Sequence, residues 1–301
     1  MTSKSVPERR SLVCIGDLVE DVVVWSAGSP RSGTDNPARI QRVRGGAASN
    51  VAVFASSLGT SVRFVGRVGD DPAGEALVRE LVVAGVDPKV QRQGRTGTIV
   101  ILVDASGERT MFPDRAAAAQ LADVPDSWIS GAEAYHLSAY SLTGPSWPVL
   151  CRASKIARAE GAILTIDAAS VALIDSVGPA AFRALIATLQ PTYVFANGAE
   201  ADIGSLRELV GPGTTVVVKN GMDPTEIHAA GNKSATVRPS PVDEVRDTTG
   251  AGDAFAAGFL AAALDNAEPV EAVEAGHSLA RRVLTQPGAN LTTDEQGVVR
   301  D

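Results

Sequence analysis

The chain has 301 residues, of which 45% are hydrophobic, and a formal charge of -8 at pH 7. It is long enough to bury a large core, and its acidic balance opposes non-specific binding to nucleic-acid phosphates. Two cysteines and three histidines are too few for a disulfide framework or a histidine-based metal centre. Residues 1–10 lack the apolar region of a signal peptide, and no later apolar run is long enough for a membrane span. We therefore expect a cytoplasmic protein with neither a nucleic-acid nor a membrane partner.

From Ser11 onward, short β-rich segments alternate with longer helical patterns, which is typical of parallel strands joined by crossover helices. We predict strands at 11–15, 61–65, 162–166, 192–195 and 215–218. We predict helices that begin near Gly46, Pro72, Ala180, Gly250 and Pro269. Residues 1–10 are expected to be a flexible tail. Residues 11–301 are expected to form a single α/β domain, a doubly wound, mostly parallel sheet with helices on both faces.

Four β-rich segments have no crossover helices between them, at 21–25, 38–44, 96–103 and 108–112. We predict that they pair into a small antiparallel sheet, with a hairpin turn at 104–107. This lid, built from about 20–27, 38–44 and 96–114, would cover a substrate and exclude water. It is also a candidate contact for a homodimer.

The most informative stretch is the loop 247–252, which leads into Asp253 and an apolar helix. Gly250 and Gly252 let the backbone approach a ligand, and free amides at a helix start favour an anion such as a transferred phosphoryl group. The Asp253 carboxylate would lie beside that anion and could deprotonate an attacking hydroxyl. The alternative is a glycine-containing helix cap with an acidic first turn. No lysine follows a glycine, so a Walker A loop is absent, and Phe255 takes the place of the third glycine of a dinucleotide fingerprint.

This stretch resembles the carboxyl-terminal signature of the ribokinase-like (PfkB) carbohydrate kinase family. A second signature of the family is similar to residues 45–52, and its Gly-Asp segment is similar to residues 68–74. The resemblance covers residues 11 to about 290. It implies an ATP-dependent kinase that phosphorylates a hydroxyl of a sugar or sugar-like molecule, with Asp253 as catalytic base. Gly250, Ala251 and Gly252 would supply the anion site, and ATP and Mg²⁺ would be the cofactors.

The resemblance also implies the substrate residues. It places Gly45, Gly46 and Asn50 against substrate hydroxyls, and Asp17 and Asp21 in the first turn, with Asp21 as the better sugar ligand. An amide side chain both donates to and accepts from hydroxyls. A nucleoside kinase of the same fold and a non-catalytic sugar-binding relative remain alternatives.

A further set of residues is implied for the nucleotide. Asn197 and Glu200 match an element that organises magnesium and phosphates, and Glu200 is expected to act on Mg²⁺ through water. Lys219 and Gly221 follow a strand, at the crevice edge where doubly wound sheets bind ligands. Pro224 stands where relatives have a second glycine, which predicts a different path for this loop.

Thr248 and His277 complete the implied nucleotide residues, although a helical histidine can equally be a packing residue. The loop 286–290, together with Asp247 and Thr249, resembles the part of the family that holds a monovalent cation, so K⁺ is a possible further cofactor. Three more charged residues are candidates near the site. Asp167 would either cap a turn or face the phosphates. Arg109 and Arg115 of the lid could reach an acidic group on the substrate, or they could simply be solvated, as arginines on exposed strands usually are.

Overall fold

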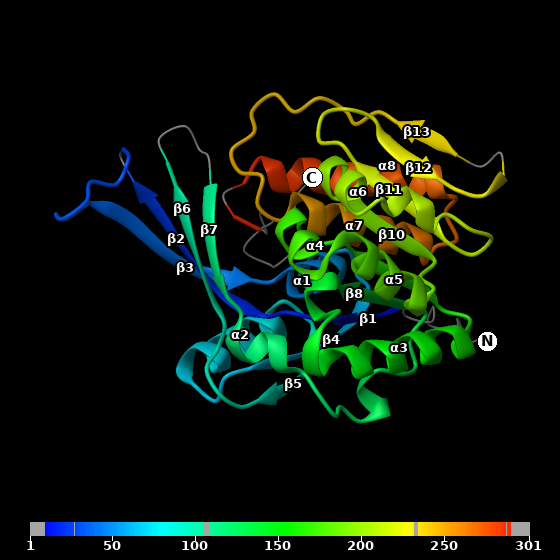
Figure 1. The fold of residues 1–301 in the computed structure, drawn as a ribbon, viewed down its shortest axis with the longest axis horizontal. Coiled ribbons are helices and arrows are strands. Elements are labelled where there is room, and N and C mark those ends of the chain that lie inside the picture. Colours follow the sequence, from blue (N-terminus) through cyan, green and yellow to red (C-terminus); the bar gives the residue numbers. More distant parts are fainter. Residues whose placement is uncertain (1–9, 27, 105–108, 232–233, 287, 290–301) are drawn as a thin grey trace, which may run out of the picture.

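The computed structural model describes residues 10–26, 28–104, 109–231, 234–286 and 288–289, so the expected tail lies outside these residues except for Arg10. A nine-stranded sheet runs through the main body in the order β13-β12-β11-β10-β9-β8-β1-β4-β5 (Figure 1). Its strands are β1 (Ser11–Ile15), β4 (Ser61–Val68), β5 (Asp87–Arg92), β8 (Ala134–Ser138), β9 (Ile163–Asp167), β10 (Tyr193–Asn197), β11 (Thr215–Lys219), β12 (Thr225–His228) and β13 (Ala235–Val237). All neighbours from β5 to β11 pair in parallel, and β12 and β13 add an antiparallel edge.

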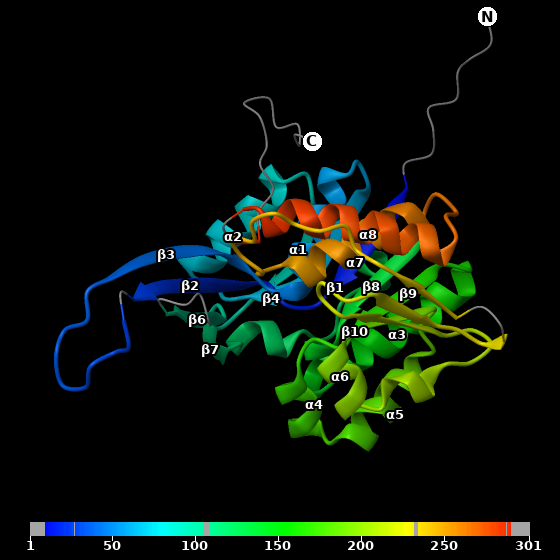
Figure 2. The same cartoon turned by 90° about the horizontal axis from the view of Figure 1, so that it is seen from above.

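Helices cover both faces of this sheet, as Figure 2 shows. One face carries α1 (Ala47–Ser57), α2 (Pro72–Val83), α7 (Ala251–Ala263) and α8 (Pro269–Leu284), and the other carries α3 (Trp147–Glu160), α4 (Val171–Val177), α5 (Pro179–Leu189) and α6 (Gly198–Ile203). The short 3-10 helices are η1 (Ala116–Gln120), η2 (Asp126–Trp128), η3 (Ala139–Ser141), η4 (Gly144–Ser146) and η5 (Leu206–Leu209). Alternate side chains of β1 enter the two cores, Leu12 and Cys14 on one face and Val13 and Ile15 on the other. The predicted doubly wound fold is confirmed.

The predicted elements lie where the local signals place them, and several others were not predicted. Asp71 caps α2 by accepting from the Gly74 amide at 2.9 Å, and the helix start predicted near Pro72 is confirmed. β5 was not predicted, because Pro88 and its charged neighbours disfavour a strand. A proline is tolerated in a strand at the edge of a sheet, which is where β5 lies. β8, α3, α4, β12 and β13 were also not predicted.

A separate four-stranded sheet stands away from the main body in the order β3-β2-β6-β7 (Figure 1). Its strands are β2 (Val19–Ser26), β3 (Ala38–Gly45), β6 (Thr98–Val103) and β7 (Arg109–Asp114). The hairpins β2–β3 and β6–β7 are antiparallel, but β2 and β6 pair in parallel. The prediction of an antiparallel sheet was therefore wrong at its central pair. Both hairpins leave the main body in the same direction, so the strands that meet in the middle run the same way.

Among the described residues, no helix by itself has the length and apolar composition to cross a membrane. The pair α4 and α5 meets those criteria only jointly, and its two helices are bent by 98° relative to each other.

Candidate active site

The site lies at the carboxyl edge of the parallel strands. Asp17 follows β1 by two residues, and Asp167, Asn197 and Lys219 are the last residues of β9, β10 and β11. Because parallel strands end at the same edge of a sheet, these side chains meet at the crevice where doubly wound folds bind ligands.

The loop 247–252, in which the sequence predicts an anion site, leads into α7 and is called the anion loop below. Gly250 precedes the helix with φ of 76°, in the left-handed region, and a Cβ there would lie 2.6 Å from that of Ala289. The Ala254 amide closes the first turn on the Gly250 carbonyl at 2.8 Å, while amides earlier in a first turn lack an intrahelical acceptor. The Lys219 Nζ lies 3.3 Å from the place that a Cβ on Gly252 would take. An ammonium group and a helix N-terminus therefore converge on one point, which favours an anion.

Asp253 is the third residue of α7 and is partly buried. Its Oδ2 accepts a hydrogen bond from Asn50 Nδ2 at 2.8 Å, and Asn50 Oδ1 accepts one from Arg44 Nη1 at 2.5 Å. Burial raises the pKa of Asp253 to about 7, the negative charge of Asp167 adds to this, and the Asn50 hydrogen bond opposes it. A carboxyl group with a pKa near the working pH is suited to general base catalysis.

Lys219 is held by Asp167. The two side chains form an ion pair of 2.7 Å with 17% and 12% of their surfaces exposed. Burial alone would lower the pKa of Lys219, but the Asp167 carboxylate raises it overall, so the amine remains charged. Burial would likewise raise the pKa of Asp167, and the lysine outweighs it. Asp167 Oδ1 also accepts from the Ala169 amide at 3.0 Å, so this residue caps a turn, and its other carboxylate oxygen holds Lys219.

Two aspartates lie where the lid joins the main body. Asp17 is buried and accepts from Arg115 Nη1 at 2.9 Å, and the Arg115 guanidinium stacks on the ring of Tyr140. Asp21 is also buried, and its Oδ1 has no hydrogen-bond partner among the described residues. Burial, followed by the negative charge of Asp17, raises the pKa of Asp21 to about 7. A buried acceptor without a partner is costly, so this oxygen is suited to receive a hydroxyl from a ligand.

Gly45 and Gly46 leave the room that these aspartates occupy. A Cβ on Gly45 would lie 2.2 Å from the Asp21 carboxyl carbon, and one on Gly46 would lie 2.4 Å from the Asp17 carbonyl oxygen. Gly46 has a φ of 104°. The Gly-Gly pair therefore allows the lid strand β3 to pass against both acidic residues.

Asn197 and Glu200 contact each other at the start of α6. Asn197 Oδ1 accepts from the Glu200 amide at 2.9 Å, and Glu200 Oε2 accepts from the Asn197 amide at 2.8 Å. This capping box is the structural role that the two residues play. Burial, and then the charge of Asp167, raises the pKa of Glu200. Mg²⁺ prefers carboxylate oxygens, so the Glu200 and Asp167 side chains at this edge of the sheet fit a divalent cation.

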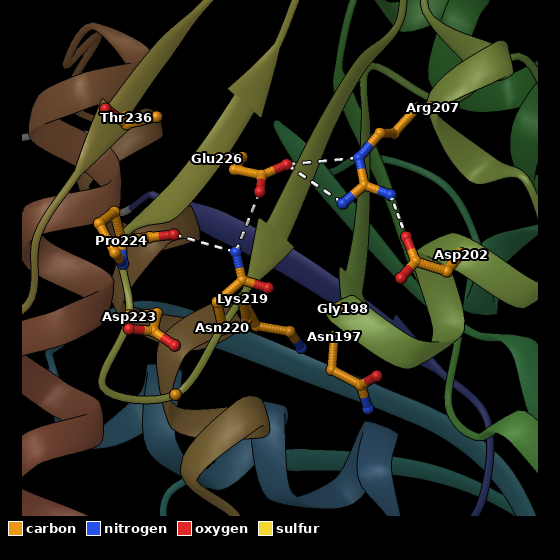
Figure 3. Close-up of a pocket in the computed structure, with 11 residues that line it drawn as sticks. Asn197, Gly198, Asp202, Arg207, Lys219, Asn220, Asp223, Pro224, Glu226 and Thr236 are labelled. Carbon is orange, nitrogen blue, oxygen red and sulfur yellow. Dashed lines mark hydrogen bonds and ion pairs between the residues drawn. The ribbon is translucent and has the colours of Figure 1, made fainter.

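A cleft of about 720 Å³ opens beside these residues (Figure 3). Its lining residues are Asn197, Gly198, Asp202, Arg207, Lys219, Asn220, Gly221, Asp223, Pro224, Glu226 and Thr236. Figure 3 shows Arg207 between Asp202 and Glu226, to which it donates at 2.5 and 3.1 Å.

The loop that carries Pro224 forms a tight turn at the edge of this cleft. The Asp223 amide donates to the Asn220 carbonyl at 3.0 Å, and the Asn220 amide group donates to the Pro224 carbonyl at 3.0 Å. Gly221 takes a φ of 62° within the turn. The cleft thus joins this turn to the Lys219 end of the anion site.

Four other predicted residues lie around the same region. Asp247 and Thr248 contact Arg109 of the lid, and the Thr249 amide donates to Asp247 Oδ1 at 2.7 Å. His277 pairs its Nε2 with Thr225 Oγ1 at 2.8 Å, and its ring packs near that of Phe255. Of the loop 286–290, residues 287 and 290 lie outside the described residues.

The sequence did not predict a role for Arg44, nor for Arg207 and Glu226, which line the cleft. Arg44 directly precedes the Gly-Gly pair, so its position beside the motif was the available signal. Arg207 and Glu226 are 19 residues apart on η5 and β12, and no local pattern connects them.

Comparisons with known proteins identify the family. The family profile described as pfkB family carbohydrate kinase matches residues 9–296. The chain belongs to the pfkB family of carbohydrate kinases. It is 28% identical to the ATP-dependent ribose-1-phosphate kinase of Halopiger xanaduensis over 91% of this chain and 92% of that protein. It is also 28% identical to the fructokinase of Klebsiella pneumoniae, over 95% of this chain and 94% of that protein.

A solved adenosine kinase from Sinorhizobium meliloti has the same fold, with a TM-score of 0.81 and 24% identity over 94% of this chain and 95% of that one. Membership of the pfkB family makes the protein an ATP-dependent carbohydrate or nucleoside kinase. The same membership implies ATP as a substrate, usually together with Mg²⁺.

Proposed function

We propose that the protein transfers the γ-phosphoryl group of ATP to a hydroxyl of a sugar or sugar-like molecule, with Asp253 as catalytic base. The observation that carries this proposal is the position of Asp253. It lies in the first turn of α7, and the Lys219 ammonium from β11 approaches that same turn at Gly252. Its carboxylate also accepts a hydrogen bond from Asn50, which lies just after the lid strand β3. A base, an anion site and a residue from the substrate side therefore meet at one place.

The residues of the chain divide the transfer step between them. The substrate oxygen attacks the γ-phosphorus, its proton passes to the Asp253 carboxylate, and the bond to the bridging oxygen of ADP breaks. Lys219 and the first-turn amides around Gly252 stabilise the charge on the migrating group. Asn50 orients the base through its 2.8 Å hydrogen bond.

Glu200 and Asp167 are the residues that would hold Mg²⁺, with Glu200 acting through water. Mg²⁺ keeps several waters and needs only one or two carboxylates besides the nucleotide phosphates. Bound there, the ion would neutralise phosphate charge. The cleft beside Lys219 would take the rest of the nucleotide, with Asn197, Gly221 and Thr248 on its phosphate side and His277 further from it.

The substrate would lie between the lid and the main body. The unpartnered Asp21 Oδ1 would accept a hydroxyl, and Asp17, Gly45, Gly46 and Asn50 would line the same place. A nucleoside is the second candidate, because the structural neighbours include adenosine kinases and the relatives include a nucleoside kinase. A non-catalytic binding role is less well supported, because the base and the anion loop are both present.

The test is ADP release with MgATP across a panel of sugars, sugar phosphates and nucleosides, followed by the Asp253→Asn variant with the best substrate. Loss of a positioned general base lowers kcat by about 10²- to 10⁴-fold. Asp253→Asn with wild-type turnover would refute the mechanism. The matched control is Asp243→Asn, a change to an exposed carboxylate that should leave kcat unchanged.

We also propose that the lid sheet forms a homodimer contact. Ile40 and Phe112 are 62% and 54% exposed, and the register of the sheet puts them on the same face as Val24 and Val100. Burying such apolar surface against a second copy would be favourable. Light scattering after gel filtration should give a dimer mass, and Phe112→Glu should give a monomer. A wild-type monomer at all concentrations would exclude this contact.

A further inference from the structure

Arg109, the first residue of β7, reaches from the lid to the loop that precedes α7. Its Nη2 forms an ion pair with Asp247 Oδ1, and its Nη1 donates to Thr248 Oγ1 at 3.2 Å. The two charged side chains are 19% and 14% exposed, although 138 residues separate them in sequence. This ion pair joins the lid to the anion loop.

Both oxygens of the Asp247 carboxylate accept hydrogen bonds in this arrangement. Oδ1 accepts from the Thr249 amide at 2.7 Å as well as from Arg109, and Oδ2 accepts from the Gly288 amide at 2.9 Å. Asp247 therefore ties the start of the anion loop to the segment after α8, with its charge already compensated.

A monovalent cation does not fit this carboxylate as it stands. The resemblance to the family places such a cation at Asp247 and Thr249, yet Asp247 Oδ1 already faces a guanidinium. Two unit charges about 4 Å apart repel by about 4 kcal/mol at an effective dielectric constant of about 20. The guanidinium and a bound K⁺ would compete for the same negative charge.

We propose that Arg109 takes the place of the monovalent cation: the lid itself supplies the positive charge that keeps Asp247 and the anion loop in position. Arg109 is thus a positioning residue, which acts on the phosphate site through Asp247. The ion pair would couple the position of the lid to the position of the anion loop, because any movement of the lid away from the main body separates the guanidinium from the loop. Turnover then requires a closed lid but no added K⁺.

The first experiment compares turnover in potassium chloride and choline chloride at equal ionic strength, and this arm depends on the proposed kinase function. We expect wild-type kcat to change by less than about twofold, or about 0.4 kcal/mol in activation free energy. Arg109→Met keeps an unbranched apolar stem but loses the guanidinium and its charge, and we expect its kcat in choline to fall by about tenfold or more. Added K⁺ or a low concentration of guanidinium ion should restore part of that loss.

A second experiment needs no substrate. The Tm of Arg109→Met should rise with K⁺ and not with choline, because a ligand that binds only the folded state stabilises it. The wild-type Tm should not distinguish the two salts. Arg42→Met is the matched control, since it removes another lid ion pair, to Glu20, that does not touch the anion loop. It should change neither the salt response nor kcat.

Three results would overturn the inference: strong activation of the wild type by K⁺, wild-type turnover by Arg109→Met in choline, or a loss in that variant that neither cation restores. If the chain proves to phosphorylate none of the substrates, the kinase proposal fails, while the Tm comparison still decides the role of Arg109.

Discussion

Replacing the candidate base should make the protein more stable at alkaline pH. Burial raises the pKa of Asp253 from its ordinary value of 3.8 to about 7, so the folded state resists ionisation of this group. The unfolded chain loses the proton near 4, and the folded state is therefore progressively destabilised as the pH rises from about 4 to about 7. Above that range the destabilisation is complete. Asp253→Asn removes the charge and keeps an oxygen for the Asn50 amide.

The size of the effect follows from the two pKa values. Their difference corresponds to about 4 kcal/mol, at about 1.4 kcal/mol per pKa unit, and this is an upper bound because Asp253 is only partly buried. We expect Asp253→Asn to gain about 2 kcal/mol at pH 8, less than about 1 kcal/mol at pH 5 and nothing at pH 4. For a chain of this size each kcal/mol raises the Tm by about 2 °C.

The assay is thermal unfolding of both proteins without nucleotide at several values between pH 5 and 8. Asp243→Asn serves as the control, because its carboxylate is exposed. A variant no more stable than the wild type at pH 8, or a gain that is the same at every pH, would refute the link between burial and the raised pKa.

Three further predictions concern the same site. Lys219→Met leaves a buried carboxylate unpaired and should cost about 3–5 kcal/mol of stability in thermal or urea unfolding, and an unchanged Tm would contradict the buried ion pair. Gly46→Ala places a Cβ against a backbone carbonyl at a φ of 104° and should cost about 1–3 kcal/mol, whereas Gly213→Ala, which meets no atom within 4 Å, should cost little. The kcat/KM profile should fall about tenfold per pH unit below about 7 as Asp253 is protonated. Asn50→Leu should move that limb to higher pH, because the amide hydrogen bond lowers the pKa of the base; a limb near pH 4 would exclude Asp253 as the titrating group.

Much of the architecture could be predicted from local residue types. The apolar run of β1, the Asp71-Pro72 start of α2 and the proline at the start of α8 each specify an element within a few residues. The alternation of strands and helices then fixes the doubly wound class, because parallel strands need crossover connections. The glycines before α7 likewise mark an anion loop.

The order of the strands in the lid could not be predicted from local residue types. Its two hairpins could be predicted from β-rich segments, but the parallel pairing of β2 with β6 joins residues 78 positions apart, such as Glu20 and Thr98. No turn or short connection sets that pairing, so the packing of the two hairpins on the main body decides it.

The sequence by itself determined the fold class and the motif residues, because helix starts, strands and glycine turns depend on neighbours along the chain. Only the tertiary structure decided which charges meet: Asn50 with Asp253, and Arg109 with Asp247, pairs that are 203 and 138 residues apart. It also decided that Asp253 has a pKa near 7, since that value depends on burial and on nearby charges brought together by folding.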